Sequence, residues 1–212
     1  GTSASYTPPA GVLNPSSYVN GSNPYNTLED AFADLEFRGV SGNIIFELQN
    51  NYSSNSEPNQ LSITYKGSST RKATIRVRSD RISSLSYSKN TSQAMLRFDG
   101  AAYVTINGAM NFTSCGVNKG ITLTNTSALS GSRLITINNG SNNIIISDVL
   151  CKVPPANTDN VGIYLACNSN DTLSNSNISI TCNRFEPISS ASTSSNAIEV
   201  GSCTSLFRNK NI

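Results

Sequence analysis

The chain has 212 residues and a formal net charge of +2, and only 13% of its residues are charged. That length suits one domain with a buried core. The weak net charge gives no long-range field that would draw nucleic acid or an anionic membrane surface. No apolar run approaches the roughly 20 residues that a membrane-spanning helix needs, so we predict no membrane insertion.

Residues 1–26 hold four of the eight prolines and are predicted to form an extended leader. Residues 27–212 are predicted to form one domain, which begins with a helix at residues 28–38. Thr27 stands at its N-cap and Gly39 at its C-terminal stop. Its apolar face is formed by Leu28, Ala31, Phe32 and Leu35. We expect this helix to cover the open end of the strand core that follows it.

Short strands follow the helix. The patterns predict strands at residues 43–48, 61–64 and 73–78. Residues 82–88 fit either a strand or a loop. In the third strand, Ile75 and Val77 alternate with Arg76 and Arg78, so the arginines are predicted to face outward.

From residue 95 onward, pairs of short apolar segments repeat. The pairs are 96–98 with 104–106, 134–137 with 144–146, 163–165 with 178–180, and 198–200 with 206–207. Phe98, Ile137, Leu165 and Val200 occupy equivalent places, 39, 28 and 35 residues apart. Two or three short strands per repeat predict an all-β solenoid whose successive coils bury apolar side chains against each other. The last repeat is unfinished, so we expect the natural protein to continue past Ile212.

Two stretches carry a resemblance to a known family: TLEDAFADLEFRGVSGNIIFEL at residues 27–48 and LRFDGAAYVTING at residues 96–108. They resemble the N-terminal part of secreted, right-handed parallel β-helix proteins of the pectin-lyase-like superfamily, most of all the large secreted and surface proteins of Bacteroidetes. The resemblance implies a right-handed parallel β-helix with an N-terminal capping helix. It also implies a location outside the cell or on its outer surface. One such scaffold carries lyases, hydrolases, adhesins and stalks alike.

All five cysteines follow residue 114, and the chain has no histidine and no CxxC pair. We therefore predict no metal site and no cofactor. Cys167 and Cys203 follow corresponding strands of successive coils, where a spacing of about 4.8 Å between strands would allow a disulfide. The favoured alternative is that both are small buried residues stacked between coils.

Acidic residues are too few and too scattered to indicate catalysis. Asp99, Asp148, Glu186 and Glu199 stand one per coil at non-equivalent offsets. Asp99 and Asp148 lie at corners, where aspartate commonly caps a turn. With no histidine and no paired-acid motif, these coils are predicted to hold no catalytic residue.

A dense run of cations is the strongest candidate for a binding site. Its members are Arg71, Lys72, Arg76, Arg78 and Arg81. Guanidinium groups bind carboxylate and sulfate bidentately, so this run is a candidate site for an anionic glycan. The favoured alternative is a solvated strand face that discourages edge pairing. No aromatic residues interleave with the cations, so nucleic-acid binding is not predicted.

Other side chains are weaker candidates. Tyr87, Tyr103 and Tyr164 are candidates for stacking on sugars, with packing beside the core favoured for the last two. Asparagines near strand ends are candidates for ladders that satisfy backbone groups at the corners. These asparagines are Asn107, Asn138, Asn139 and Asn183.

The sequence favours a non-catalytic extracellular β-helix segment of a larger secreted or cell-surface protein, serving in adhesion, in glycan contact or as a stalk. The alternative is the N-terminal part of a polysaccharide lyase or glycoside hydrolase whose active site lies in coils beyond residue 212. The expected partners are a polysaccharide or cell-surface glycan and further coils of the same polypeptide.

Overall fold

The computed structural model describes residues 25, 27–48, 52, 54–77, 85–110, 115–155, 160–166, 174–188 and 196–201. Within these ranges the chain consists mostly of short strands in parallel sheets, with one α-helix and one 3₁₀ turn, η2 (Ser54–Ser56). The predicted leader lies outside them apart from Tyr25. In the described part, no helix has the length and apolar character needed to span a bilayer.

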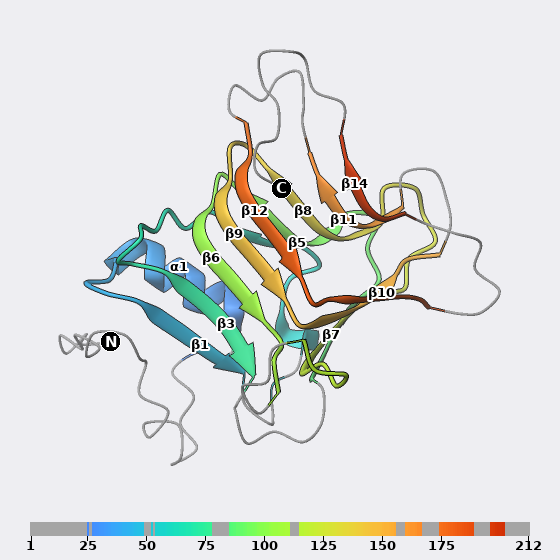
Figure 1. Cartoon of the computed structure of the whole chain (residues 1–212), viewed down its shortest axis with the longest axis horizontal. Helices are drawn as coiled ribbons and strands as arrows, with labels where there is room; N and C mark the ends of the chain where they lie inside the picture. The colour runs from blue at the N-terminus through green and yellow to red at the C-terminus, as the bar shows by residue number, and fades with distance from the viewer. Residues whose placement is uncertain are drawn as a thin grey trace.

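Three parallel sheets make up the body of the chain (Figure 1). The β6 sheet consists of β1 (Ile44–Leu48), β3 (Ala73–Val77), β6 (Ala102–Asn107), β9 (Asn142–Ser147) and β12 (Ser176–Thr181). The β7 sheet consists of β4 (Leu85–Lys89), β7 (Ile121–Asn125), β10 (Val149–Val153) and β13 (Arg184–Pro187). The β8 sheet consists of β2 (Leu61–Ile63), β5 (Ala94–Asp99), β8 (Arg133–Asn138), β11 (Val161–Leu165) and β14 (Asn196–Val200).

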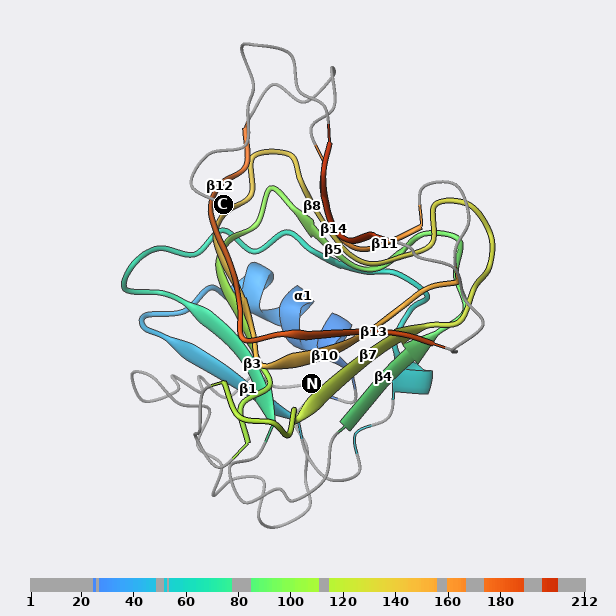
Figure 2. The same ribbon diagram turned by 45° about the vertical axis from the view of Figure 1, so that its right-hand side comes forward.

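The chain visits these sheets in a fixed rotation. From β2 onward it passes from the β8 sheet to the β6 sheet and then to the β7 sheet, so each strand pairs with the strand three places later. Figure 2 shows the three sheets around a common interior. Each repeat therefore has three strands, whereas the sequence pattern allowed either two or three. Residues 85–89 form a strand rather than a loop.

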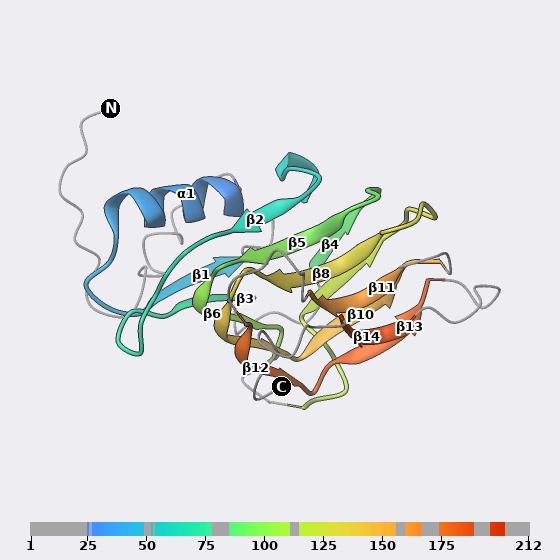
Figure 3. The same ribbon diagram turned by 90° about the horizontal axis from the view of Figure 1, so that it is seen from above.

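The predicted helix is confirmed as α1 (Leu28–Arg38). Thr27 accepts a hydrogen bond from the backbone N–H of Asp30 at 3.0 Å, and Gly39 ends the helix with a φ of 67°. The predicted apolar face is buried. The ring centroids of Phe32 and of Phe46 on β1 are 5.1 Å apart. Figure 3 shows α1 beside the first strands, at one end of the sheets. The helix covers this end of the core as expected.

The predicted alignment of the repeats is confirmed residue by residue. Phe98, Ile137, Leu165 and Val200 are direct partners in neighbouring strands of the β8 sheet. Phe98, Ile137 and Leu165 are fully buried. Because side chains alternate between faces, a slip of one residue would turn this whole set outward, so the burial of these side chains specifies the register.

The apolar columns become exposed at the end opposite α1. Ile163 and Leu165 are fully buried, whereas their partners Ile198 and Val200 on β14 are 42% and 50% exposed. β14 is the last described strand of its sheet. The predicted strand at residues 206–207 lies outside the described residues.

Every described strand of the β6 sheet from β6 onward carries the same backbone kink. The second residues of β6, β9 and β12 are Tyr103, Asn143 and Asn177, and their φ angles are 58°, 52° and 53°. This left-handed region is tolerated by asparagine better than by most residues with a side chain. The kink therefore belongs to the repeat rather than to any one residue.

Candidate functional site

The predicted cation run does not form one surface of free charges. Arg71 and Lys72 are exposed. Arg76 faces outward as predicted, but its guanidinium forms an ion pair with Glu47 at 2.8 Å. Glu47 and Arg76 are direct partners in β1 and β3. Arg78 and Arg81 lie outside the described residues.

Arg71 borders a hollow of about 280 Å³ beside the C-terminal end of α1. The lining residues are Leu35, Glu36, Gly39, Val40, Thr64, Tyr65, Lys66 and Arg71. We call this hollow the α1 groove. It contains a second cation, Lys66, which sequence reasoning missed because Lys66 stands apart from the dense run that begins at Arg71.

Backbone and side-chain hydrogen bonds hold one wall of the α1 groove in place. Ser68 and Arg71 exchange two backbone hydrogen bonds of 3.1 and 3.0 Å. The hydroxyl of Tyr65 donates to the carbonyl of Arg71 at 2.8 Å. The carboxylate of Glu36, which also lines the groove, accepts from the backbone N–H and the hydroxyl of Thr64. The groove is therefore built on a defined turn.

The described part of the chain supplies no carboxylate partner to the cations of the α1 groove. Across the described residues, no ion pair involves Lys66, Arg71 or the adjacent Lys72. The side chain of Arg71 donates only a long hydrogen bond of 3.4 Å to the hydroxyl of Ser68. Three exposed cations within seven residues of chain therefore remain available to an anionic group.

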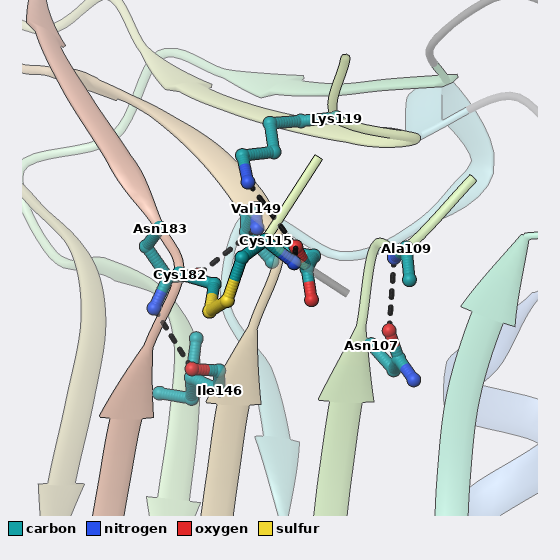
Figure 4. A network of polar contacts seen from close by, with 9 residues as sticks. Asn107, Ala109, Cys115, Lys119, Ile146, Val149, Cys182 and Asn183 are labelled. Carbon is teal, nitrogen blue, oxygen red and sulfur yellow. Dashed lines mark hydrogen bonds and ion pairs between the residues drawn. A yellow bond between two sulfur atoms is a disulfide. The ribbon is translucent and has the colours of Figure 1, made fainter. Parts of the chain in front are cut away.

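A second polar feature lies where the β6 sheet passes into the β7 sheet (Figure 4). A single residue, Asp148, joins β9 to β10. In the preceding repeat, residues 108–120 join β6 to β7 as a long excursion, of which residues 111–114 are not described. A Cβ atom added at Gly108 would lie 2.2 Å from the carbonyl oxygen of Asp148, so the excursion leaves the sheet where only glycine fits.

Three bonds hold the excursion to the corner at Asp148. Cys115 forms a disulfide with Cys182, with Cα atoms 4.7 Å apart. The backbone N–H of Cys115 donates to the carboxylate of Asp148 at 2.7 Å. The ammonium of Lys119 pairs with the same carboxylate at 3.1 Å, and the two side chains are only 8% and 2% exposed.

Asp148 therefore does more than cap a turn. Its φ of 57° fits the corner role predicted for it. Its carboxylate also binds a segment that lies about 30 residues away, at Cys115 and Lys119. A carboxylate that is buried and occupied in this way is positioned for structural support rather than for contact with a substrate.

The disulfide joins cysteines that the sequence did not pair. The predicted candidates Cys167 and Cys203 lie outside the described residues. Cys151 is a buried free thiol, and burial raises its pKa to about 12, so it stays protonated at neutral pH.

The tyrosines proposed for sugar stacking differ in exposure. Tyr87 is only 4% exposed, so its proposed role as a stacking surface was wrong: the ring packs inside, beside Leu123 of the neighbouring strand. Tyr164 is partly exposed and carries the guanidinium of Arg133 over its ring, 3.9 Å from the ring centroid.

Glu57 is the most deeply buried described glutamate, at 4% exposure. Its carboxylate accepts hydrogen bonds from the backbone N–H groups of Leu28 and Glu29, at 2.6 and 3.2 Å, and from the hydroxyl of Tyr52. Burial raises its pKa, although these hydrogen bonds oppose that shift. Glu57 therefore caps the N-terminus of α1 by accepting from its first backbone N–H groups, a position where a carboxylate is favourable.

In the described ranges, no group of three or more His, Cys, Asp or Glu side chains is placed to hold a metal ion. Comparisons with protein-family models, curated proteins and solved structures each returned no match.

Proposed function

We propose that this chain is a segment of a right-handed parallel β-helix in which each coil contributes one strand to each of the three sheets. Two features support the proposal: the fixed rotation of strands among the sheets, and the in-register stacking of apolar side chains from repeat to repeat. Stacked repeats of this kind bury a continuous core that no single repeat could bury alone.

We further propose that the chain is a non-catalytic module of a secreted or cell-surface protein that contacts acidic glycans. The observation that carries this proposal is a set of exposed cations without ion-pair partners among the described residues: Lys66 and Arg71, which line the α1 groove, and the adjacent Lys72. Carboxylate and sulfate groups are the natural complements of such cations. A hollow bordered by charged and apolar side chains also suits a sugar, which has polar edges and an apolar face.

The disulfide supports an extracellular location. Disulfides persist in oxidising compartments and are rare in the reducing cytosol. The bond between Cys115 and Cys182 is partly exposed, so a reducing environment would reach it. This observation agrees with the location implied by the resemblance to secreted β-helix proteins.

The test is binding of the chain to polygalacturonate and heparin, with neutral dextran as the reference polysaccharide. In the combined variant Lys66→Gln, Arg71→Gln and Lys72→Gln, the dissociation constant for the acidic polymers should rise at least about tenfold, since each lost charge-assisted contact is worth about 1.5 kcal/mol or more. Binding by the unaltered chain should weaken with added salt.

A control variant removes two cations elsewhere on the surface. Lys152 and Arg184 lie on the outer face of the β7 sheet, so Lys152→Gln with Arg184→Gln should leave binding within about twofold of the unaltered chain if the α1 groove is the site. Equal losses in the groove variant and in this control would mean that only general charge attracts the polymer, and would refute the groove.

A further inference from the structure

Arg133 differs from the other described arginines in its bonding. Its Nε atom is buried and has no hydrogen-bond partner. Its side chain forms no ion pair with any described residue. Its described contact is with the ring of Tyr164, on which the guanidinium is stacked at 3.9 Å.

The other described arginines all have polar partners for their side chains. Four form ion pairs with carboxylates, and Arg71 donates to the hydroxyl of Ser68. The ion pairs are Arg38 with Asp34, Arg76 with Glu47, Arg97 with Asp99, and Arg184 with Glu186. A guanidinium carries five N–H donors, and leaving them unpaired at a partly buried position is unfavourable. The N–H donors of Arg133 are therefore available to an acceptor from outside the described protein groups.

The fold places this guanidinium against an aromatic ring of the neighbouring strand. Arg133 begins β8, and Tyr164 stands on the neighbouring strand β11, where it is the direct partner of Thr136. Tyr164 alternates with the buried Ile163 and Leu165, so its ring lies on the outer face of the β8 sheet, and the guanidinium carbon of Arg133 lies over that ring. The ring covers one side of the guanidinium, and its terminal N–H groups have no acceptor among the described protein groups, so they are left to donate hydrogen bonds.

The surrounding outer face is polar and carries a second cation. In the same column of outward-facing residues, Arg97 precedes Thr136, and Glu199 follows Tyr164. Arg97 is already paired with Asp99 at 3.1 Å, and Glu199 accepts from Asn196 at 3.0 Å. Neither acid is paired with Arg133, so the guanidinium has no carboxylate partner among the described residues.

We propose that Arg133, with Tyr164 as its stacking platform, binds one carboxylate or sulfate group of an acidic saccharide through two parallel N–H···O hydrogen bonds. A carboxylate has two oxygens and a sulfate group has three, and in both anions two oxygens can accept the parallel N–H groups of one guanidinium. The saccharide class rests on the proposed function, whereas the oxyanion site rests on Arg133 alone. The site lies on the outer face of the β8 sheet and is separate from the α1 groove.

The test measures binding of three probes to the whole chain by titration calorimetry: a galacturonate oligomer, a heparin oligosaccharide of matched length, and a neutral dextran oligosaccharide. Arg133→Gln should weaken binding of at least one acidic probe at least tenfold, and the probe affected tells whether the site takes carboxylate or sulfate. Arg133→Lys keeps the charge but loses the fork, so it should restore less than half of the lost binding free energy. Tyr164→Phe keeps the ring and should bind like the unaltered chain, whereas Tyr164→Leu should resemble Arg133→Gln.

Two further results separate this site from a structural role and from the α1 groove. Because the guanidinium satisfies no polar group of the protein, the melting temperature of Arg133→Gln should be unchanged or raised, and a marked fall would contradict the proposal. Loss of binding in Arg133→Gln supports the site even where the variants of the α1 groove bind normally. Normal binding in Arg133→Gln, or no binding of either acidic probe by the unaltered chain, would overturn it.

Discussion

At the scale of single residues, buried and half-buried asparagine side chains hold the corners of successive repeats together. Each of four asparagines accepts a hydrogen bond from a backbone N–H that lies 28 to 34 residues earlier in the chain. These asparagines are Asn125, Asn160, Asn175 and Asn183. Asn183 was among the candidates for such ladders, and the other three were not. Corner backbone groups that would otherwise be buried without partners are satisfied in this way.

Asn125 offers the clearest test of this role. It is fully buried, and its amide group donates to the carbonyls of Thr91, Gln93 and Arg133 and accepts from the N–H groups of Thr91 and Ser127. Asn125→Ala leaves these groups unpaired and should lower the free energy of unfolding by about 3 kcal/mol or more. Urea denaturation measures the change.

The control is Asn90→Ala, because Asn90 is exposed and stands near the same corner. This variant should change the free energy of unfolding by less than about 0.5 kcal/mol. Similar losses in both variants would show that asparagine supports the corners only through its turn propensity.

Tyr103 occupies a kinked position where the next two repeats have asparagine. Its φ of 58° places a bulky side chain in the left-handed region, at a cost of about 1 kcal/mol. Tyr103→Asn should therefore raise the free energy of unfolding by about 1 kcal/mol, whereas Asn143→Ala should lower it by a similar amount. A destabilised Tyr103→Asn variant would show that packing of the phenol ring outweighs the backbone strain.

At the scale of elements, α1 depends on a carboxylate from outside the helix. Glu57 binds its N-terminal N–H groups, and α1 closes one end of the core. Sequence reasoning found the local caps, Thr27 and Gly39, because their positions follow from helix periodicity. It did not find Glu57, which lies 29 residues beyond Leu28 and has no local signature.

The pH dependence of stability tests the position of Glu57. Because burial raises its pKa above the ordinary glutamate value of 4.5, the folded chain holds a proton that the unfolded chain has lost. This contribution to stability is fully present below about pH 4.5 and is lost as the pH rises through the raised value.

The difference in unfolding free energy between the unaltered chain and Glu57→Gln should therefore fall as the pH is raised from about 4.5 toward neutrality. The neighbouring Tyr52 and Tyr87 stay protonated in this range, since burial raises the pKa of both above the ordinary value of 10.0. Urea denaturation at a series of pH values gives the comparison. A difference that grows with pH would contradict a raised pKa at Glu57.

The excursion between β6 and β7 depends on its disulfide. The bond between Cys115 and Cys182 closes a loop of 67 residues, so the chain-entropy model predicts a stabilisation of about 4 kcal/mol. In the double variant Cys115→Ser with Cys182→Ser, the free energy of unfolding measured by urea denaturation should fall by about this amount. Reductant should lower the free energy of unfolding of the unaltered chain to that of the variant. It should leave the free energy of unfolding of the variant unchanged. A loss of less than about 1 kcal/mol would mean that Lys119 and Asp148 hold the excursion unaided.

At the scale of the whole molecule, sequence periodicity predicted the architecture well, because the core of each repeat is formed by its own apolar segments. Phe98, Ile137 and Leu165 could be aligned from the sequence, since burial of one strand face permits only one register. The third strand of each repeat was harder to see. Cys151 in β10 shares its inward column with Leu123 and Phe185, and this mixture of side chains gives little repeated signal.

The candidate sites were less predictable, because they depend on contacts between repeats. The pairing of Arg76 with Glu47 could have been found by aligning the apolar positions of β1 and β3. The unpaired state of Arg133 could not, since no sequence pattern shows that a partner is missing. A cation run in a sequence therefore marks charge density, whereas the available charges depend on what the fold places beside each of them.

The most direct test of the central claim is one assay on the purified chain. It measures salt-dependent retention on a panel of acidic and neutral polysaccharides and, in the same samples, the release of reducing ends and unsaturated products. We predict retention on acidic polymers alone, weakened by salt, with no product formed. Product formation would contradict a non-catalytic module, and equal retention on neutral polymers would contradict recognition through the cations.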